Sequence, residues 1–245
     1  MALAVLVLAF SAGARTPMLA LLAVRRLKNL ALIVLPYGAG LLVIPVLGPA
    51  LGAADRAGLL AVAISPALLA GPALATAMGG RMDRAGALLA GTIAASFVLI
   101  LARAGAAGSA AQGAMFAFVA GAATISVIPT LPATARSAVQ RIGDAAFVVL
   151  LGVGIAGGPS LGPTSALAAL AIFAATVGVA GLAARVAGID PRSAIAGAGT
   201  RDPAVAVALA VTLGGPSAAG IPLYTAALLL VFGAAIVAAN RRKAR

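Results

Sequence analysis

The stretch IAGAGTRDPAVAVALAV, residues 195–211, decides the fold because it sets Arg201, Asp202 and Pro203 side by side in an apolar segment. Each of the three is costly in a membrane-spanning helix. A charged group is unfavourable in hydrocarbon, and proline removes a backbone hydrogen bond and clashes with the preceding turn. The stretch therefore predicts a helix that is interrupted close to Arg201.

The composition is that of an integral membrane protein. Of the 245 residues, 63% are hydrophobic and 9% are charged, and the mean hydropathy is +1.16. A soluble domain has about 25% charged residues, so the polar groups here are too few to cover a soluble surface. Apolar runs of about 20 residues recur without strict alternation, which favours membrane-spanning helices over an outer-membrane barrel.

The residue types that are absent from the sequence limit the chemistry that the protein can perform. The sequence contains no Cys, no His and no Glu. Disulfides, thiol chemistry, the usual metal-ligand clusters and a Ser-His-Asp triad are therefore excluded. We expect no catalytic residue, no metal and no cofactor, and we expect that the protein is not an enzyme. The basic residues that give the net charge of +12 lie at the ends of apolar runs. This placement indicates that they set the orientation of the chain in a membrane, and it predicts no nucleic-acid partner.

Nine apolar segments are predicted to span the membrane: 2–14, 29–50, 58–78, 85–103, 112–131, 145–157, 164–184, 194–213 and 217–239. The first and the sixth are short for a full crossing. With the C-terminus in the cytoplasm, the cytoplasmic segments become 15–28, 79–84, 132–144, 185–193 and 240–245. They carry all basic residues except Arg56 and Arg103 on the outer side and Arg201 within a span. This positive-inside bias predicts a multi-pass protein of a bacterial-type inner membrane with a cytoplasmic C-terminus.

Two alternatives bear on this topology. In the first, residues 185–203 form one cytoplasmic loop and 204–213 do not cross the membrane. The C-terminal basic cluster would then lie outside, which contradicts the positive-inside rule. Separately, the N-terminal run with Ala12-Gly13-Ala14 is similar to a signal peptide, although it lacks a basic n-region.

The interruption near Arg201 predicts a substrate or ion site. Unwound backbone at membrane depth is tolerated only where it is buried in protein or lines a cavity, and charged groups there generally face a cavity or a partner. A break also lets Arg201 and Asp202 point into one site, which neighbours on a regular helix cannot do. The alternatives are that the two charges neutralise each other, or that they lie in a deep opening on the cytoplasmic side of the membrane.

A second segment, AVAISPALLAGPALATAMGG at 61–80, is broken at Ser65-Pro66 and at Gly71-Pro72. Each broken segment is the middle member of a trio of spans, and the trios start on opposite sides of the membrane. This arrangement predicts an inverted repeat within one polytopic membrane domain, 1–245, with 1–131 as the first repeat and 132–245 as the second. The alternative is that Pro and Gly are common in membrane helices generally.

These residues resemble the bile acid:sodium symporter family, and the likeness runs through nearly the whole chain. The clearest parts are residues 5–20, 61–96 and 194–240, which contain SAGARTP (11–17), ISPALLAGPALATAMGGRMDR (64–84) and GAGTRDPAVAVALA (197–210). The resemblance implies an all-α membrane fold of inverted five-helix repeats, in which two discontinuous helices cross at the binding site. It also implies that this chain lacks the first helix of the first repeat, which leaves about nine transmembrane helices.

The sequence departs from the family at its sodium ligands. Gly71 and Pro72 stand where the family has a Ser-Asn pair. Gly197, Arg201 and Asp202 stand at the family's Glu and Gln-Asn positions, and Gly40 stands at a Gln. A hydroxyl ligand is retained as Thr92. Because Gly and Pro side chains supply no oxygen, the implied sodium sites are dismantled.

Arg201 offers a replacement for the lost cation. Its guanidinium is permanently charged, and it can bind a carboxylate or a sulfonate through two hydrogen bonds. We hypothesise that Asp202 pairs with it or couples transport to protons. The predicted substrate-binding residues are Arg201, Asp202, Thr200, Ser65 and Thr92, and the predicted helix breaks are Pro66, Gly71, Pro72, Gly197, Gly199 and Pro203. Four hydroxyl side chains either line the predicted cavity or only hydrogen-bond to backbone: Ser65, Thr76, Thr92 and Ser96. The two tyrosines, Tyr37 and Tyr224, are predicted to be packing or interfacial residues.

The sequence therefore predicts a secondary active transporter or facilitator of a small organic anion, of the bile acid:sodium symporter type, that does not use the family's sodium sites. Its expected partners are the organic anion, the lipid bilayer and, under the Asp202 hypothesis, protons. The alternative is a non-transporting degenerate paralogue that acts as a membrane subunit or receptor. A core closed over Arg201 by apolar side chains would favour this alternative.

Overall fold

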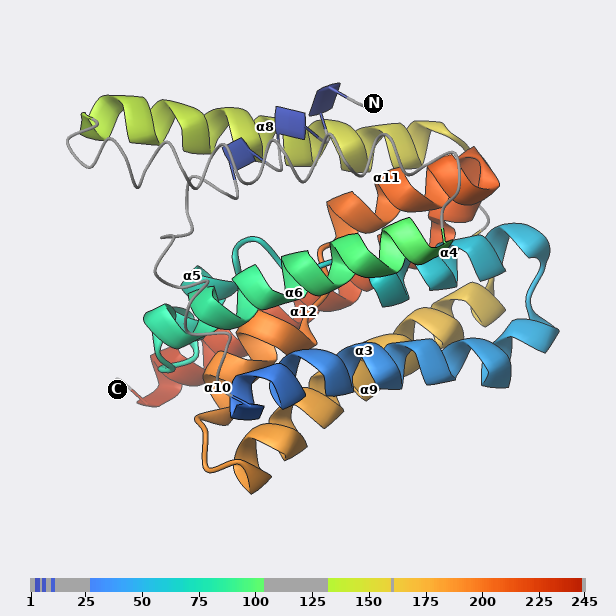
Figure 1. Cartoon of the computed structure of the whole chain (residues 1–245). Coiled ribbons are helices and arrows are strands. Elements are labelled where there is room, and N and C mark those ends of the chain that lie inside the picture. The colour runs from blue at the N-terminus through green and yellow to red at the C-terminus, as the bar shows by residue number, and fades with distance from the viewer. Residues whose placement is uncertain are drawn as a thin grey trace.

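The computed structural model describes residues 3–4, 6–7, 10–11, 27–103, 132–159 and 161–243, and within these ranges the regular structure is helical (Figure 1). The long helices are α3 (Leu27–Leu47), α6 (Met82–Arg103), α8 (Ala133–Ala156), α9 (Pro163–Val186) and α12 (Gly220–Lys243). The shorter ones are α4 (Ala53–Ile64), α5 (Gly71–Ala77), α10 (Pro191–Ala194) and α11 (Pro203–Gly214). Single turns lie at Gly48–Ala50, at Ile195–Gly199, which is π-helical, and at Pro216–Ala219.

Five stretches of the described chain are long and apolar enough to cross a membrane: Lys28–Ala50, Met82–Ile100, Ser137–Ala156, Pro163–Val186 and Pro216–Ala239. Together with the helical content, they confirm the prediction of an all-α membrane protein. Four of them match the predicted spans 29–50, 85–103, 164–184 and 217–239 to within a few residues. The predicted span 112–131 and most of 2–14 lie outside the described residues.

The predicted span 145–157 was wrong in its start. α8 begins at Ala133 and has 24 residues, so it is not a short crossing. Arg136, Arg141 and Asp144 therefore lie on the helix and not in a separate loop. Hydropathy finds only the apolar part of such a helix, whereas the Ala-rich sequence before it also favours the helical conformation. Asp144 falls inside a candidate span, so Asp202 is not the only carboxylate placed at such a position.

The predicted span 58–78 is divided into α4 and α5. α4 ends at Ile64, and Ser65 adopts an extended conformation with φ −65° and ψ 151°. Pro66 explains this change, because a proline disfavours the helical conformation of the residue before it. Residues 65–70 then run without regular helix until α5 begins at Gly71.

The predicted span 194–213 is divided in the same way. α10 is followed directly by the π-helical turn, which ends at Gly199. Thr200 is extended, and α11 begins at Pro203. Proline suits this first helical position, because its missing N–H would have no partner there in any case.

The two interruptions cross and hydrogen-bond to each other. Ala67 and Arg201 form an isolated antiparallel β-bridge. The Leu68 N–H donates to the Thr200 carbonyl at 3.1 Å, and the Asp202 N–H donates to the Pro66 carbonyl at 2.9 Å. The backbone groups that the breaks release therefore satisfy one another, as a buried polar backbone requires.

One end of the bundle brings together three segments that were predicted to be cytoplasmic. Lys28 Nζ donates to the Ala187 carbonyl at 3.4 Å, and Arg192 Nη1 donates to the Gly79 carbonyl at 3.3 Å. At the opposite end, the Ser165 hydroxyl donates to Asp55 Oδ1 at 3.0 Å, which joins two segments next to the predicted outer loops. The predicted grouping of the loops thus agrees with the packing, while the side of the membrane stays a prediction.

The helices pack through small residues. α3 and α9 lie side by side (Figure 1) and run antiparallel, since Lys28 meets Ala187 while a Cβ at Gly40 would lie 3.3 Å from Thr176 Cγ2. At the crossing, a Cβ at Gly197 would lie 2.5 Å from the Ala85 carbonyl oxygen. This distance is shorter than any ordinary contact, so glycine is required where the π-helical turn passes over α6.

Replacing Gly197 by alanine is expected to destabilise the protein by about 1–3 kcal/mol, the usual cost of overpacking a buried site. The clash is with backbone, which cannot rotate away. Gly178→Ala is the matched control. A Cβ there meets nothing within 4 Å, so this change should be neutral or stabilising by up to about 1 kcal/mol. Thermal midpoints of the purified variants in detergent would test this, and equal midpoints would contradict it.

Asp190 caps α10 in the turn after α9. Its carboxylate accepts the N–H groups of Arg192 at 3.3 Å and Ser193 at 3.0 Å, and the Ser193 hydroxyl lies within hydrogen-bond distance of it. Partial burial raises the pKa of Asp190, but the hydrogen bonds from Ser193 and Arg192 outweigh this effect and hold the pKa below its usual value. The Ser193 hydroxyl also accepts the Arg81 N–H at 2.7 Å, so the cap ties α10 to the start of α6.

Asp190→Ala is expected to cost about 1 kcal/mol, as for other N-caps. Because the folded-state pKa is depressed, this stability is present above the unfolded pKa of about 3.9 and is lost as the pH falls through the folded value. The difference in thermal midpoint between wild type and variant should therefore shrink as the pH falls from about 5 through the folded-state pKa, which lies below about 3.9. A difference that stays constant over this range would show that the ionised carboxylate does not stabilise the turn.

Candidate functional site

Arg201 lies at the crossing of the two interruptions, buried on all sides. Its side chain is 2% exposed and is among the largest fully buried side chains of the described chain. Nη1 donates to the Ser65 carbonyl at 3.3 Å, and Cζ lies 3.9 Å from the centroid of the Tyr37 ring. Ser65 is the C-cap of α4, so the cation sits at the negative end of that helix and over the negative face of an aromatic ring.

Tyr37 is the residue that sequence reasoning missed, because it was predicted to be a packing or interfacial residue. It is 3% exposed, and its hydroxyl lies 2.7 Å from the Thr92 carbonyl and 3.1 Å from the Ser65 carbonyl, either of which can accept its proton. It therefore links α3, α6 and the first interruption. A tyrosine within an apolar span is a usable signal, since a buried hydroxyl needs a partner.

Asp202 caps a helix and does not contact the neighbouring arginine. Its Oδ1 accepts the N–H groups of Ala204 and Val205, each at 3.0 Å, and its Oδ2 accepts the Leu69 N–H at 3.2 Å. The carboxylate thus serves the start of α11 and the chain that leads into α5. Arg201 and Asp202 are both described residues, and no ion pair joins them. Each charge is balanced at a helix end.

The predicted hydroxyl ligands are bonded to backbone. Thr200 Oγ1 donates to the Ala196 carbonyl at 3.0 Å, Ser65 Oγ to Val62 at 2.9 Å, and Thr92 Oγ1 to Leu89 at 2.8 Å. Thr76 and Ser96 likewise donate to carbonyls. Ser65 and Thr92 do lie near Arg201, because their carbonyls bind its neighbour Tyr37. The hydroxyl of Thr200 turns back to its own segment.

Three glycines at which the family resemblance predicted lost sodium ligands are closely packed by neighbouring atoms. A Cβ at Gly71 would collide with the Ala196 carbonyl, and one at Gly197 with Ala85. A Cβ at Gly40 would touch Thr176 and Ala63. These glycines allow close approach of backbones and leave no room for a longer side chain. Among the described residues, no group of three or more Asp side chains could hold a metal ion.

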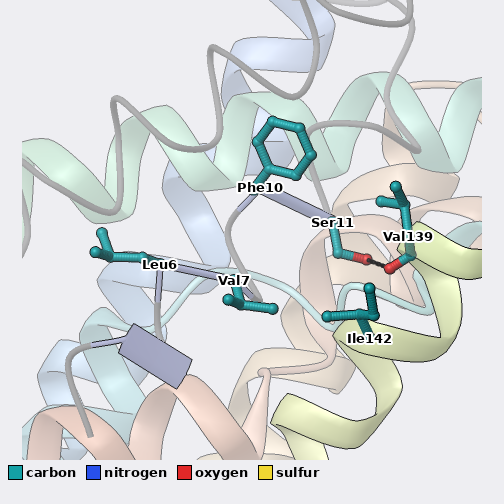
Figure 2. A pocket seen from close by; sticks show the side chains of 6 residues that line it. All are labelled: Leu6, Val7, Phe10, Ser11, Val139 and Ile142. Carbon is teal, nitrogen blue, oxygen red and sulfur yellow. Dashed lines mark hydrogen bonds between the residues drawn. The ribbon is translucent and has the colours of Figure 1, made fainter.

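An open apolar pocket of about 330 Å³ lies elsewhere, between the N-terminal residues and α8 (Figure 2). It is lined by Leu6, Val7, Phe10, Ser11, Val139 and Ile142. The Ser11 hydroxyl donates to the Val139 carbonyl at 3.1 Å (Figure 2). None of these lining residues belongs to the crossing, and none carries a charge.

The chain matches no protein-family model, and a search of curated proteins finds no significant relative. The geometry of the crossing therefore carries the functional argument.

Asp202→Asn is expected to destabilise the protein by about 1–3 kcal/mol. The amide keeps an oxygen for Ala204 and Val205, but its NH₂ group then faces the Leu69 N–H, so one buried donor loses its acceptor. Asp83→Asn is the control. Asp83 is 68% exposed in its ion pair with Arg81, and exposed pairs contribute about 0–1 kcal/mol. Chemical or thermal unfolding in detergent would measure both. Equal losses of stability in the two variants would show that the buried carboxylate of Asp202 contributes no more than the exposed one of Asp83.

Proposed function

We propose that the protein is a membrane carrier, a secondary active transporter or facilitator that moves a small organic anion by alternating access. The observation that carries this proposal is the crossing of two interrupted helices around a buried arginine. Discontinuous helices that meet in the interior of a bundle are the usual place for a transporter's binding site. A buried cation at such a place is costly, which favours a functional role.

The directions of the helices support an inverted repeat. α3 and α9, the first members of the two trios, run antiparallel, as matched helices of an inverted repeat must. Each is followed by an interrupted segment and then by a long helix, α6 or α12. This order supports the architecture of the bile acid:sodium symporter type, with repeats at 1–131 and 132–245, as part of the proposal.

Transport at this site is proposed to be independent of sodium. Glycines 40, 71 and 197 bring backbone and small side chains into the space where side-chain ligands would project. Arg201 meanwhile places a fixed positive charge at the C-terminal end of α4, where discontinuous helices of transporters bind cations. The guanidinium thus takes the electrostatic place of a bound ion.

The contacts of Asp202 favour a capping role over proton coupling. An ionised carboxylate accepts all three of its backbone hydrogen bonds. A proton on either oxygen would weaken this set, so proton transfer would require the cap to open during each cycle. Uptake by Asp202→Asn with an unchanged pH dependence would exclude coupling through this residue.

A specific observation favours the second candidate, a non-transporting membrane subunit or receptor. Arg201 and Tyr37 are only 2% and 3% exposed, and the hydroxyls around them are bonded to backbone. A carrier has such closed packing in its occluded state, whereas a subunit would keep it permanently. Transport assays separate the two.

Proteoliposomes that contain the purified protein are expected to take up small organic anions from a radiolabelled panel, equally in sodium and in potassium buffers. Arg201→Gln should reduce this uptake at least tenfold, because the buried cation is lost. Arg185→Gln is the matched control, since Arg185 is exposed at the end of α9, and it should retain most of the uptake.

Three results would count against this assignment. Uptake that requires sodium would show that ion sites exist elsewhere in the chain. Uptake that is unchanged in Arg201→Gln would show that the substrate binds away from the crossing. No uptake of any anion by well-folded protein would favour the subunit or receptor.

A further inference from the structure

The buried side-chain donors at the crossing have hydrogen-bond partners, except for two atoms of Arg201. The first N–H groups of α11 and the Leu69 N–H bind Asp202. The protein's own carboxylate thus occupies the N-terminus of α11, the kind of helix end that holds anionic substrates in broken-helix transporters. Among the buried side-chain nitrogen and oxygen atoms of the described residues, only Nε and Nη2 of Arg201 lack a hydrogen-bond partner. An anion at this crossing would therefore be recognised by these two atoms.

The two unpartnered atoms lie on one edge of the guanidinium. In arginine, the Nε–H and one N–H of Nη2 point in the same direction, and this fork matches two oxygens bonded to one atom. Nη1 is engaged separately by the Ser65 carbonyl. The Tyr37 ring covers one face of the group at 3.9 Å from Cζ. The charged plane is thus fixed in orientation, while its bidentate edge is unused.

We propose that the Nε–Nη2 edge of Arg201 is a binding site for an oxyanion that presents two oxygens on a single atom, such as a carboxylate or a sulfonate. This inference rests on the proposed function and specifies its ligand chemistry. A halide cannot use both donors in the same way, and a neutral amide of the same shape lacks the charge. Lysine at this position would keep the charge but lose the fork.

The edge is reached only when the packing opens. Arg201 and Tyr37 are both almost fully buried, and Tyr37 belongs to α3, whereas the arginine belongs to the crossing. Separation of α3 from the crossing would uncover the guanidinium. Pro36 precedes Tyr37 within α3, and a proline inside a helix is a common position for bending.

The test measures binding by isothermal titration to the full-length protein in lipid nanodiscs at constant ionic strength. The probes are the oxyanions acetate, benzoate and methanesulfonate, the halide bromide, and neutral benzamide. At least one oxyanion is expected to bind at least tenfold more tightly than both bromide and benzamide. Arg201→Lys should weaken that oxyanion at least tenfold, whereas the same change at the exposed Arg185, Arg185→Lys, should alter its binding less than threefold.

Several outcomes would overturn the site. These are equal binding of bromide and the oxyanions to wild type, unchanged binding to Arg201→Lys, and no binding of any oxyanion. The comparison of probes on wild type needs no variant, so a poorly folded Arg201→Lys does not remove the test.

Parallel flux measurements in proteoliposomes separate this inference from the proposed function. Selective binding without flux would support the site and overturn transport. Flux of the anions without oxyanion selectivity would support transport and overturn the bidentate site.

Discussion

Hydrogen bonds between two broken helices are the constraint on which the rest of the structure depends. Each break leaves polar backbone groups inside an apolar protein, where water cannot bind them. The Leu68 N–H and the Pro66 carbonyl find their partners in Thr200 and Asp202 of the other break. Neither break would be tolerable alone, so the two segments must meet, and the long helices around them must leave room for the crossing.

The placement of the two buried charges follows from that crossing. Asp202 is the N-cap of α11 and also accepts the Leu69 N–H, while Arg201 reaches the C-terminal end of α4. Adjacent residues of opposite charge thus serve opposite helix ends instead of pairing with each other. This arrangement is favourable because helix N-termini carry partial positive charge and C-termini partial negative charge. The protein supplies its own counter-charges where other broken-helix proteins bind ions and substrates.

Close packing around the crossing limits what the site can bind. Gly71 and Gly197 bring the crossing segments against each other and against α6 at distances that exclude any side chain. Among the buried side chains of the described residues, the hydrogen-bonding groups without a partner belong to one edge of Arg201. A ligand must therefore reach that edge of Arg201, and because the residue is buried, the packing around it must open for the ligand to arrive. These features connect the proposed carrier activity with a small oxyanion as its cargo.

The sequence by itself determined the membrane class, the positions of the long helices 29–50, 85–103, 164–184 and 217–239, and the interruptions at Pro66 and Pro203, because hydropathy and proline act locally along the chain. It misplaced the start of α8, since helix propensity extends beyond the apolar residues that hydropathy detects. Only the tertiary structure decided that Tyr37 stacks on Arg201 and that Asp202 is a cap and not an ion-pair partner. Those contacts join residues far apart in sequence, and they depend on how the two breaks cross, which no local pattern specifies.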